Sequence, residues 1–186
     1  MNIFALHIEP KTCATMHCDK HVVKMILESA QMICTTHHLY PNEYVDYDIP
    51  YKLAYVNHPC TKWVRQSMSN YNWLVSMVGH LNDEYKYRYN HTKNHKSYDV
   101  VLSLPPPDLG DIGLTPFVMA MPDEYKSDDP VFSYKLYYNM DKAELLKYTK
   151  RIPPACFPSA TVKVGGKEMN AYNVSSPIIG DKVMSR

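Results

Sequence analysis

The sequence lacks an apolar run approaching the roughly 18 residues that can span a bilayer. It also lacks the pattern of a secretory signal, because the first ten residues, MNIFALHIEP, have no basic segment and only a short apolar stretch. These absences exclude a transmembrane helix and predict a protein of the cytoplasm without a membrane partner. For a viral protein this would be the host cytoplasm.

A regular cysteine framework is also missing. The five cysteines are odd in number and irregularly spaced, which favours reduced thiols over disulfides. The chain contains no phosphate-binding P-loop, nucleophile elbow, Gly-x-Gly-x-x-Gly or His-Glu-x-x-His motif. We therefore expect neither a cofactor nor a bound metal.

The net charge is only +1, but the charges are unevenly distributed. Residues 57–96 carry six Lys or Arg against two acids, residues 97–130 carry one against seven, and residues 131–151 carry five against two. A local basic face is what DNA binding requires. Helices with solvated basic sides next to an acidic loop would give the same pattern.

With 186 residues, 45% of them apolar, the chain suits one domain with one core. We predict a mainly α, compact single-domain helical bundle over residues 1–186, with residues 152–186 a candidate for a loosely packed extension. Helices are expected over 10–36 with a break near 18–19, over 57–89 with a restart at 69–70, and over 129–151. An extended segment is expected over 2–8, a short apolar element over 100–104, and a long ordered loop or lid over 105–129. A small β-hairpin is expected at 165–166.

The first long helix carries the main candidate site. At 100° per residue, Lys24, Glu28 and Gln31 lie within about 80° of His21, and apolar side chains cover most of the remaining circumference. A narrow polar wedge on such a helix faces solvent or a pocket. Lys24 and Glu28 alone would also make an ordinary surface ion pair. The mixture of residue types instead offers an acid, a base, a nucleophile and an amide.

A zinc site is an alternative interpretation of the same region. Cys13, His17 and His21 are spaced four and four, with Cys18 between them. However, the helix is expected to break near Cys18, and no Cys-x-x-Cys pair completes a standard ligand set. Buried thiols and a capping His17 explain the pattern better.

Two basic segments are candidates for DNA contacts. His58, Lys62 and Arg65 form a stripe at helical spacing and suit phosphate oxygens. Tyr87 and Arg88 belong to a stretch that interleaves aromatic and basic groups, as in binders of single strands and flipped bases. A solvated helix end would show the same interleaving.

A known family shares the central motif of the first helix. Asp19-Lys20-His21, followed by Glu28 seven residues after the histidine, resembles the bacteriophage and algal-virus pyrimidine-dimer DNA glycosylases of the dimer-specific endonuclease V type. The resemblance covers about the first 95 residues. It implies a helical DNA repair glycosylase and AP lyase that acts on pyrimidine dimers or another altered pyrimidine through an amine Schiff base. Glu28 would be the catalytic carboxylate, and His21 would help hold the substrate or the backbone.

Two departures from that family affect the expected site. The family has threonine after the initiator methionine, which allows methionine removal, whereas this chain has Asn2, which normally does not. The nucleophile would then be the α-amine of Met1, or Lys24 with a pKa lowered by burial. α-Amines suit the role because their usual pKa is about 7.7–8.0. The family's arginine three residues beyond the glutamate is Gln31 here.

Two further functions are compatible with the sequence. The same His, Lys and Glu helix would serve an enzyme of nucleotide or modified-base metabolism that holds phosphate on the basic stripe. A non-catalytic phage interaction protein would use the wedge only as a surface.

Overall fold

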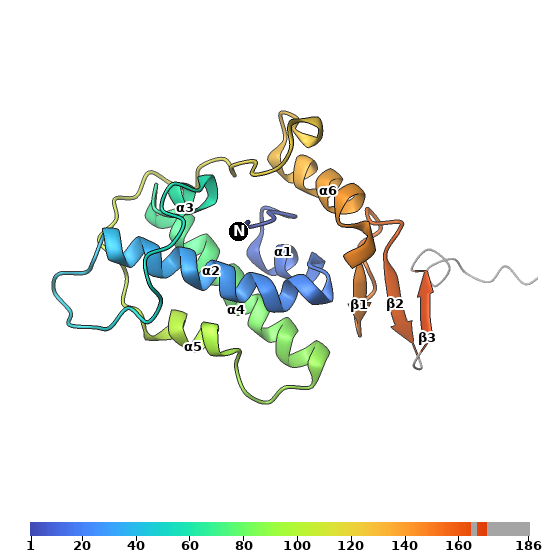
Figure 1. Cartoon of the computed structure of the whole chain (residues 1–186), viewed down its shortest axis with the longest axis horizontal. Helices are drawn as coiled ribbons and strands as arrows, with labels where there is room; N and C mark the ends of the chain where they lie inside the picture. The colour runs from blue at the N-terminus through green and yellow to red at the C-terminus, as the bar shows by residue number, and fades with distance from the viewer. Residues whose placement is uncertain (165–166, 171–186) are drawn as a thin grey trace, which may run out of the picture.

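A computed structural model describes residues 1–164 and 167–170, and it is mainly helical with one compact domain, as predicted (Figure 1). The helices are α1 (Pro10–Met16), α2 (Asp19–Leu39), α3 (Pro59–Val64), α4 (Met68–Tyr89), α5 (Lys96–Ser103) and α6 (Pro130–Asp141), with 3-10 turns η1 (Asp123–Tyr125) and η2 (Ala143–Leu145). No helix in the described part of the chain is both long and apolar enough to cross a membrane.

The centre of the domain is α2, which packs against α4, α3 and α5. Its apolar residues recur at helical spacing, so several sides of the helix are buried at once. Its fully buried apolar side chains include Val22, Ile26, Ala30 and Ile33. Of the polar wedge, Lys24 is exposed and Glu28 and Gln31 are half-buried, whereas His21 is buried.

The predicted helix starts are confirmed where a capping residue precedes proline. The Asp129 carboxylate accepts hydrogen bonds from Val131 N and Phe132 N at the start of α6. His58 caps α3 in the same way, with Pro59 in the first turn. The expected break at 18–19 is also present, between α1 and α2.

Three predicted boundaries are wrong. The restart in the second helical region follows Ser67, the N-cap residue of α4, and the apolar element at 100–104 overlaps the end of α5. The last helix stops at Asp141 and not near residue 151. The reason is tertiary: Leu146 and Tyr148 are buried in the core, and the Tyr148 hydroxyl donates to Met16 O at 2.7 Å, which an extended strand allows.

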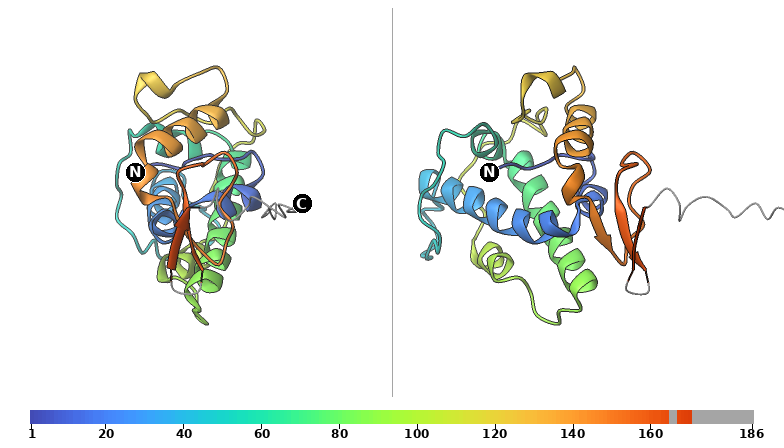
Figure 2. Two further views of the ribbon diagram at one scale, coloured as in Figure 1. Left: turned by 90° about the vertical axis from the view of Figure 1, so that its right-hand side faces the viewer. Right: turned by 45° about the vertical axis from the view of Figure 1, so that its right-hand side comes forward.

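A small sheet covers one end of the bundle (Figures 1 and 2). Strand β1 (Lys147–Thr149) pairs in parallel with β2 (Thr161–Val164), which pairs antiparallel with β3 (Lys167–Asn170). Residues 165–166, where the hairpin turn was expected, and the final residues 171–186 lie outside the described residues. Within the expected loose extension, Phe157 and Ala160 are buried.

The amino-terminal segment runs through the interior. Residues 2–6 are buried without regular secondary structure, and Phe4 turns the chain with φ of 50°. This left-handed conformation is unfavourable for a bulky residue and persists only where surrounding contacts fix it. The amino terminus is consequently held at a defined place, between α3 and α6 and beside α2 (Figures 1 and 2).

Candidate active site

Glu28 on α2 is in contact with two amines. The Met1 α-amine nitrogen lies 3.7 Å from Glu28 Oε2, and the Lys24 Nζ lies 3.4 Å from Oε1. Asn2 N–H also donates to Oε2 at 2.9 Å. The Glu28 side chain is 13% exposed and that of Lys24 is 57% exposed. The structure thus brings together Met1, Lys24 and Glu28, three of the four predicted catalytic residues.

The position of the Lys24–Glu28 pair follows from local structure. Lys24 and Glu28 are four residues apart on α2 and so share one face. The amine arrives at the same face because the buried segment 2–6 fixes the chain behind it. Gln31 is half-buried one turn further along α2.

His58 extends the site from α3. Its Nδ1 accepts a hydrogen bond from Cys60 N–H at 3.2 Å, so this nitrogen is unprotonated and Nε2 carries the proton of the neutral ring. Burial, followed by the positive charge of the amino terminus, lowers the pKa of His58, and Glu28 opposes that shift. The site therefore contains a neutral imidazole that can donate from Nε2.

Cys60 is not a nucleophile under ordinary conditions. It is fully buried behind the site, and burial raises the pKa of its thiol to about 11. The thiol stays protonated and behaves as a small apolar side chain.

The prediction that His21 takes part in catalysis needs correction. Its side chain is buried in the core, where the ring stacks on Phe4 at 4.7 Å. Its Nδ1 lies 2.8 Å from the Tyr138 hydroxyl, which itself accepts from Cys18 N–H at 2.9 Å and so has its proton available for His21. Burial, followed by the nearby His17 and Lys24, lowers the pKa of His21 to about 3. His21 supports the bend at Phe4 as a neutral core residue.

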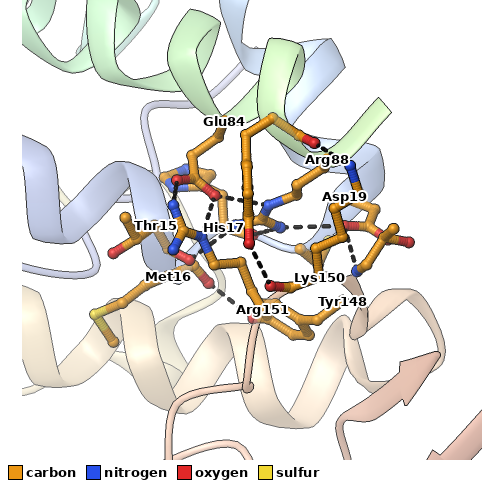
Figure 3. A network of polar contacts seen from close by, with 12 residues as sticks. Thr15, Met16, His17, Asp19, Glu84, Arg88, Tyr148, Lys150 and Arg151 are labelled. Carbon is orange, nitrogen blue, oxygen red and sulfur yellow. Dashed lines mark hydrogen bonds and ion pairs between the residues drawn. The ribbon is translucent and has the colours of Figure 1, made fainter. Parts of the chain in front are cut away.

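Arg88 was predicted to contact DNA, and this too is wrong, because its side chain is fully buried in a polar network (Figure 3). It donates to Glu84 at 2.8 Å, to Asp19 at 3.1 Å, and to the carbonyls of Thr15 and His17 at 2.9 and 2.8 Å. These contacts satisfy the carbonyl of Thr15 near the end of α1 and that of its C-cap residue His17, and they join α1, α2 and α4. Arg88 is a structural residue.

Tyr87, next to Arg88 in the sequence, remains accessible. It is 46% exposed, with the Arg151 guanidinium carbon 4.4 Å and the Lys150 Nζ 5.3 Å from its ring centroid. Both cations come from the segment after β1. Aromatic and basic groups therefore meet at Tyr87, but the cations over its ring come from a distant part of the chain and not from the predicted stretch.

The basic stripe lies at a separate hollow of about 510 Å³. Lys62 and Arg65 line it together with Trp63 and Gln66, and Lys62 is exposed. Arg65 also donates to Val56 O at 2.8 Å. Two of the three predicted residues therefore share one surface, while His58 belongs to the amine site.

A larger groove of about 730 Å³ adjoins the Lys24–Glu28 pair through Lys24. One wall is α2, and the others come from the end of α4, from η2 and from β1. Its lining residues are Asp19, Lys20, Val23, Lys24, Tyr89, Glu144, Leu145 and Lys147. The side of Lys24 that faces away from Glu28 can therefore meet a ligand in this groove.

The alternative zinc set is not assembled. Over residues 1–164 and 167–170, no group of three or more His, Cys, Asp or Glu is placed to hold a metal ion. His17 Nδ1 donates to Cys13 O at 2.8 Å, and Cys13 Sγ contacts Phe4 O at 3.5 Å. Burial lowers the pKa of His17 to about 4 and raises that of Cys13 to about 12, which suits neutral core residues.

Sequence reasoning missed the residues that hold the amino terminus, chiefly Asn2 and Tyr134. The Asn2 side chain is buried, and its Oδ1 lies 2.9 Å from the Tyr134 hydroxyl. Tyr134 and Tyr138 are four apart in α6 and therefore share one face. That spacing was the available signal that both point inward.

Fold and site together define a class of protein: a mainly helical domain that buries its amino-terminal segment and places its α-amine beside a glutamate of a central helix. Residues 1–97, which carry this amine and glutamate, match the family model described as pyrimidine dimer DNA glycosylase. The match covers just over half of the 186 residues, and the chain belongs to this family. No curated protein and no solved structure matches the chain. Membership of this family implies a protein of DNA repair with DNA as its substrate.

Proposed function

We propose that the protein is a glycosylase and AP lyase that excises a pyrimidine dimer or another altered pyrimidine, with the α-amine of Met1 as the nucleophile. The observation that carries this proposal is the 3.7 Å approach of the amine nitrogen to Glu28 Oε2. A carboxylate next to an amine can take its proton and can stabilise positive charge on a reacting sugar.

The reaction begins when the amine lone pair attacks C1′ of the altered nucleoside. The C1′–N bond breaks, its electron pair leaves with the base, and the base gains a proton. Glu28 accepts a proton from the attacking nitrogen. The C1′–O4′ bond then opens, O4′ is protonated, and a Schiff base joins the nitrogen to C1′.

Strand cleavage follows from the Schiff base. A proton is removed from C2′, and the C3′–O bond breaks so that its electron pair leaves with the phosphate. Glu28 is the nearest base for this proton, and the neutral His58 offers Nε2–H to an oxygen of the substrate. Hydrolysis of the remaining imine returns the free amine.

The surfaces around the amine suit a damaged strand. Lys24 is exposed beside Glu28, and Lys62 lies exposed on α3, so both can meet phosphates. The groove beside Lys24 has aliphatic and aromatic walls from Val23, Leu145 and Tyr89, which suit the planar faces of a displaced base. We assign the altered base to this groove.

The test is borohydride trapping on a duplex that contains a single thymine dimer, with the undamaged duplex as the control. Hydride reduces the Schiff base to a stable amine, so we expect a covalent adduct on damaged DNA only. Peptide mapping should place the adduct on Met1. Residues added before Met1 should abolish it, and Lys24→Ala should retain it.

Other outcomes assign the site differently. An adduct that survives the amino-terminal extension and disappears in Lys24→Ala would transfer the role of nucleophile to Lys24. The absence of both adduct and cleavage on damaged DNA would overturn the proposal and favour a nucleotide substrate or a binding role.

A further inference from the structure

The side chain of Asn2 is a buried junction between the amino terminus and the rest of the molecule. Its Nδ2 donates to Ala120 O at 2.8 Å, and its Oδ1 accepts from Ile3 N–H at 2.8 Å. The same Oδ1 lies 2.9 Å from the Tyr134 hydroxyl. A side-chain amide has an NH2 donor and a carbonyl acceptor, and both make hydrogen bonds here.

Tyr134 holds the opposite side of this junction. Its ring is buried on α6, and its hydroxyl lies 2.8 Å from Val118 O and accepts from Ala120 N–H at 3.3 Å. Asn2 and Tyr134 therefore bind the loop segment 118–120 from two sides. Burial raises the pKa of Tyr134 well above its usual range, so the hydroxyl remains a donor.

This junction is one residue from the reacting nitrogen. The backbone N–H of Asn2 donates to Glu28 Oε2, and the Met1 amine approaches the same oxygen. Loss of the contacts of the Asn2 side chain would let the Asn2 N–H and the Met1 amine move away from Glu28. The Met1 side chain adds a weaker contact, because its Sδ lies 3.6 Å from Thr61 Oγ1.

The loop 118–120 and α6 lie outside residues 1–97, which match the family model. We propose that Asn2 and Tyr134 are positioning residues that hold the Met1 amine against Glu28, so that the C-terminal half of this chain completes the active site; this rests on the proposed Schiff-base function. The group that is positioned is the α-amine of Met1, 3.7 Å from Glu28 Oε2, while the Asn2 nitrogen, 2.9 Å from the same oxygen, is an amide that holds the carboxylate.

The test compares Tyr134→Phe with Tyr71→Phe in the full chain. Both changes remove one buried hydroxyl and keep the ring. The Tyr71 hydroxyl lies 2.8 Å from His37 Nε2 and contacts neither Asn2 nor the histidines that pack on Phe4. Asn2→Asp is the second variant, since it keeps the size of the side chain and loses the donor to Ala120 O. Intact mass should show Met1 in every variant.

Two readouts are expected to move in opposite directions for Tyr134→Phe and Asn2→Asp. Single-turnover adduct formation at saturating damaged DNA should slow roughly ten- to a hundredfold, because the amine is misplaced. Labelling of the Met1 amine by a small acylating reagent at neutral pH, without DNA, should become several-fold faster, because the amine is released from Glu28. Tyr71→Phe should leave both rates near wild type.

Equal changes in the two tyrosine variants would show that the contacts of Tyr134 only stabilise the fold, and would overturn the proposal. Unchanged labelling in Tyr134→Phe would also overturn it. If the wild-type protein forms no adduct, but Tyr134→Phe is still labelled faster than wild type, the Schiff-base function would be refuted and the positioning role would stand. A mass without Met1 would refute the assignment of the nucleophile to Met1, because the α-amine would then be that of Asn2.

Discussion

Glu28 faces an α-amine with one oxygen and a lysine ammonium with the other. Substitution by glutamine retains an acceptor for Asn2 N–H and removes the charge and the base. We expect Glu28→Gln to reduce single-turnover strand cleavage by roughly 10²–10⁴-fold, the usual contribution of a positioned acid or base. Far-ultraviolet circular dichroism and the melting temperature should stay near wild type. Cleavage at the wild-type rate would remove Glu28 from the mechanism.

The second amine at Glu28 gives a contrasting prediction. Lys24 is 57% exposed, so we expect Lys24→Met to change stability little. If Lys24 contacts a phosphate, the slope of log affinity against log salt for damaged duplex should fall by roughly one. Fluorescence anisotropy between 50 and about 200 mM salt measures this slope. An unchanged slope would exclude Lys24 from the DNA contact.

At the residue scale, spacing predicted the Lys24–Glu28 pair because helical geometry alone places residues four apart on one face. The approach of Met1 was expected only from the family resemblance. Its physical cause is the buried path of residues 2–6, which depends on contacts with α3, α6 and the loop before α6. No local pattern encodes such contacts.

At the scale of elements, the buried network around Arg88 joins α1, α2 and α4 (Figure 3). Burial acts to raise the pKa of Glu84, but the hydrogen bond from Arg151 and the charge of Arg88 outweigh it and lower the pKa. Glu84 therefore stays ionised and needs its cations. A DNA-binding role for Arg88 is incompatible with this arrangement.

Replacement of Arg88 should accordingly affect folding and not DNA contacts. We expect Arg88→Met to lower the free energy of unfolding by about 3 kcal/mol or more, because it leaves buried carboxylate and carbonyl groups without a partner. Lys86→Met is the matched control on the same helix, since Lys86 pairs with the exposed Asp83. Its effect should be within about 0.5 kcal/mol in urea denaturation. Equal effects would contradict the assigned role of the network.

The starts and ends of the helices were not equally predictable. A capping residue followed by proline is a local signal, and it correctly predicted the start of α6 at Asp129 and Pro130. The end of α6 was predicted ten residues too late. The strand after it is fixed by the burial of Tyr148 and by the bonds from Thr149 to Asp19, which join segments 130 residues apart. Propensity does not contain that information.

At the scale of the whole molecule, three buried histidines connect the stability of the fold to pH. Burial lowers the pKa of His17 and of His37 to about 4 and that of His21 to about 3. An unfolded histidine has a pKa of about 6.5. The unfolded chain therefore binds more protons than the native one below pH 6.5, and stability falls as the pH decreases from about 6.5 to about 4.

We expect the free energy of unfolding to be nearly constant between pH 7 and 8 and to fall below pH 6.5, by up to about 1.4 kcal/mol per pH unit for each histidine. In His17→Asn the amide can still donate to Cys13 O but does not titrate, so the fall should be less steep by one proton. Urea denaturation at half-unit steps of pH measures these slopes.

His21 and His17 also lie against Phe4, so their protonation in acid should release the amino-terminal segment. Labelling of the Met1 amine should then be faster in acid than the gradual decline that protonation of an amine alone gives. A smooth decline together with a wild-type slope in His17→Asn would show that these histidines do not control the segment.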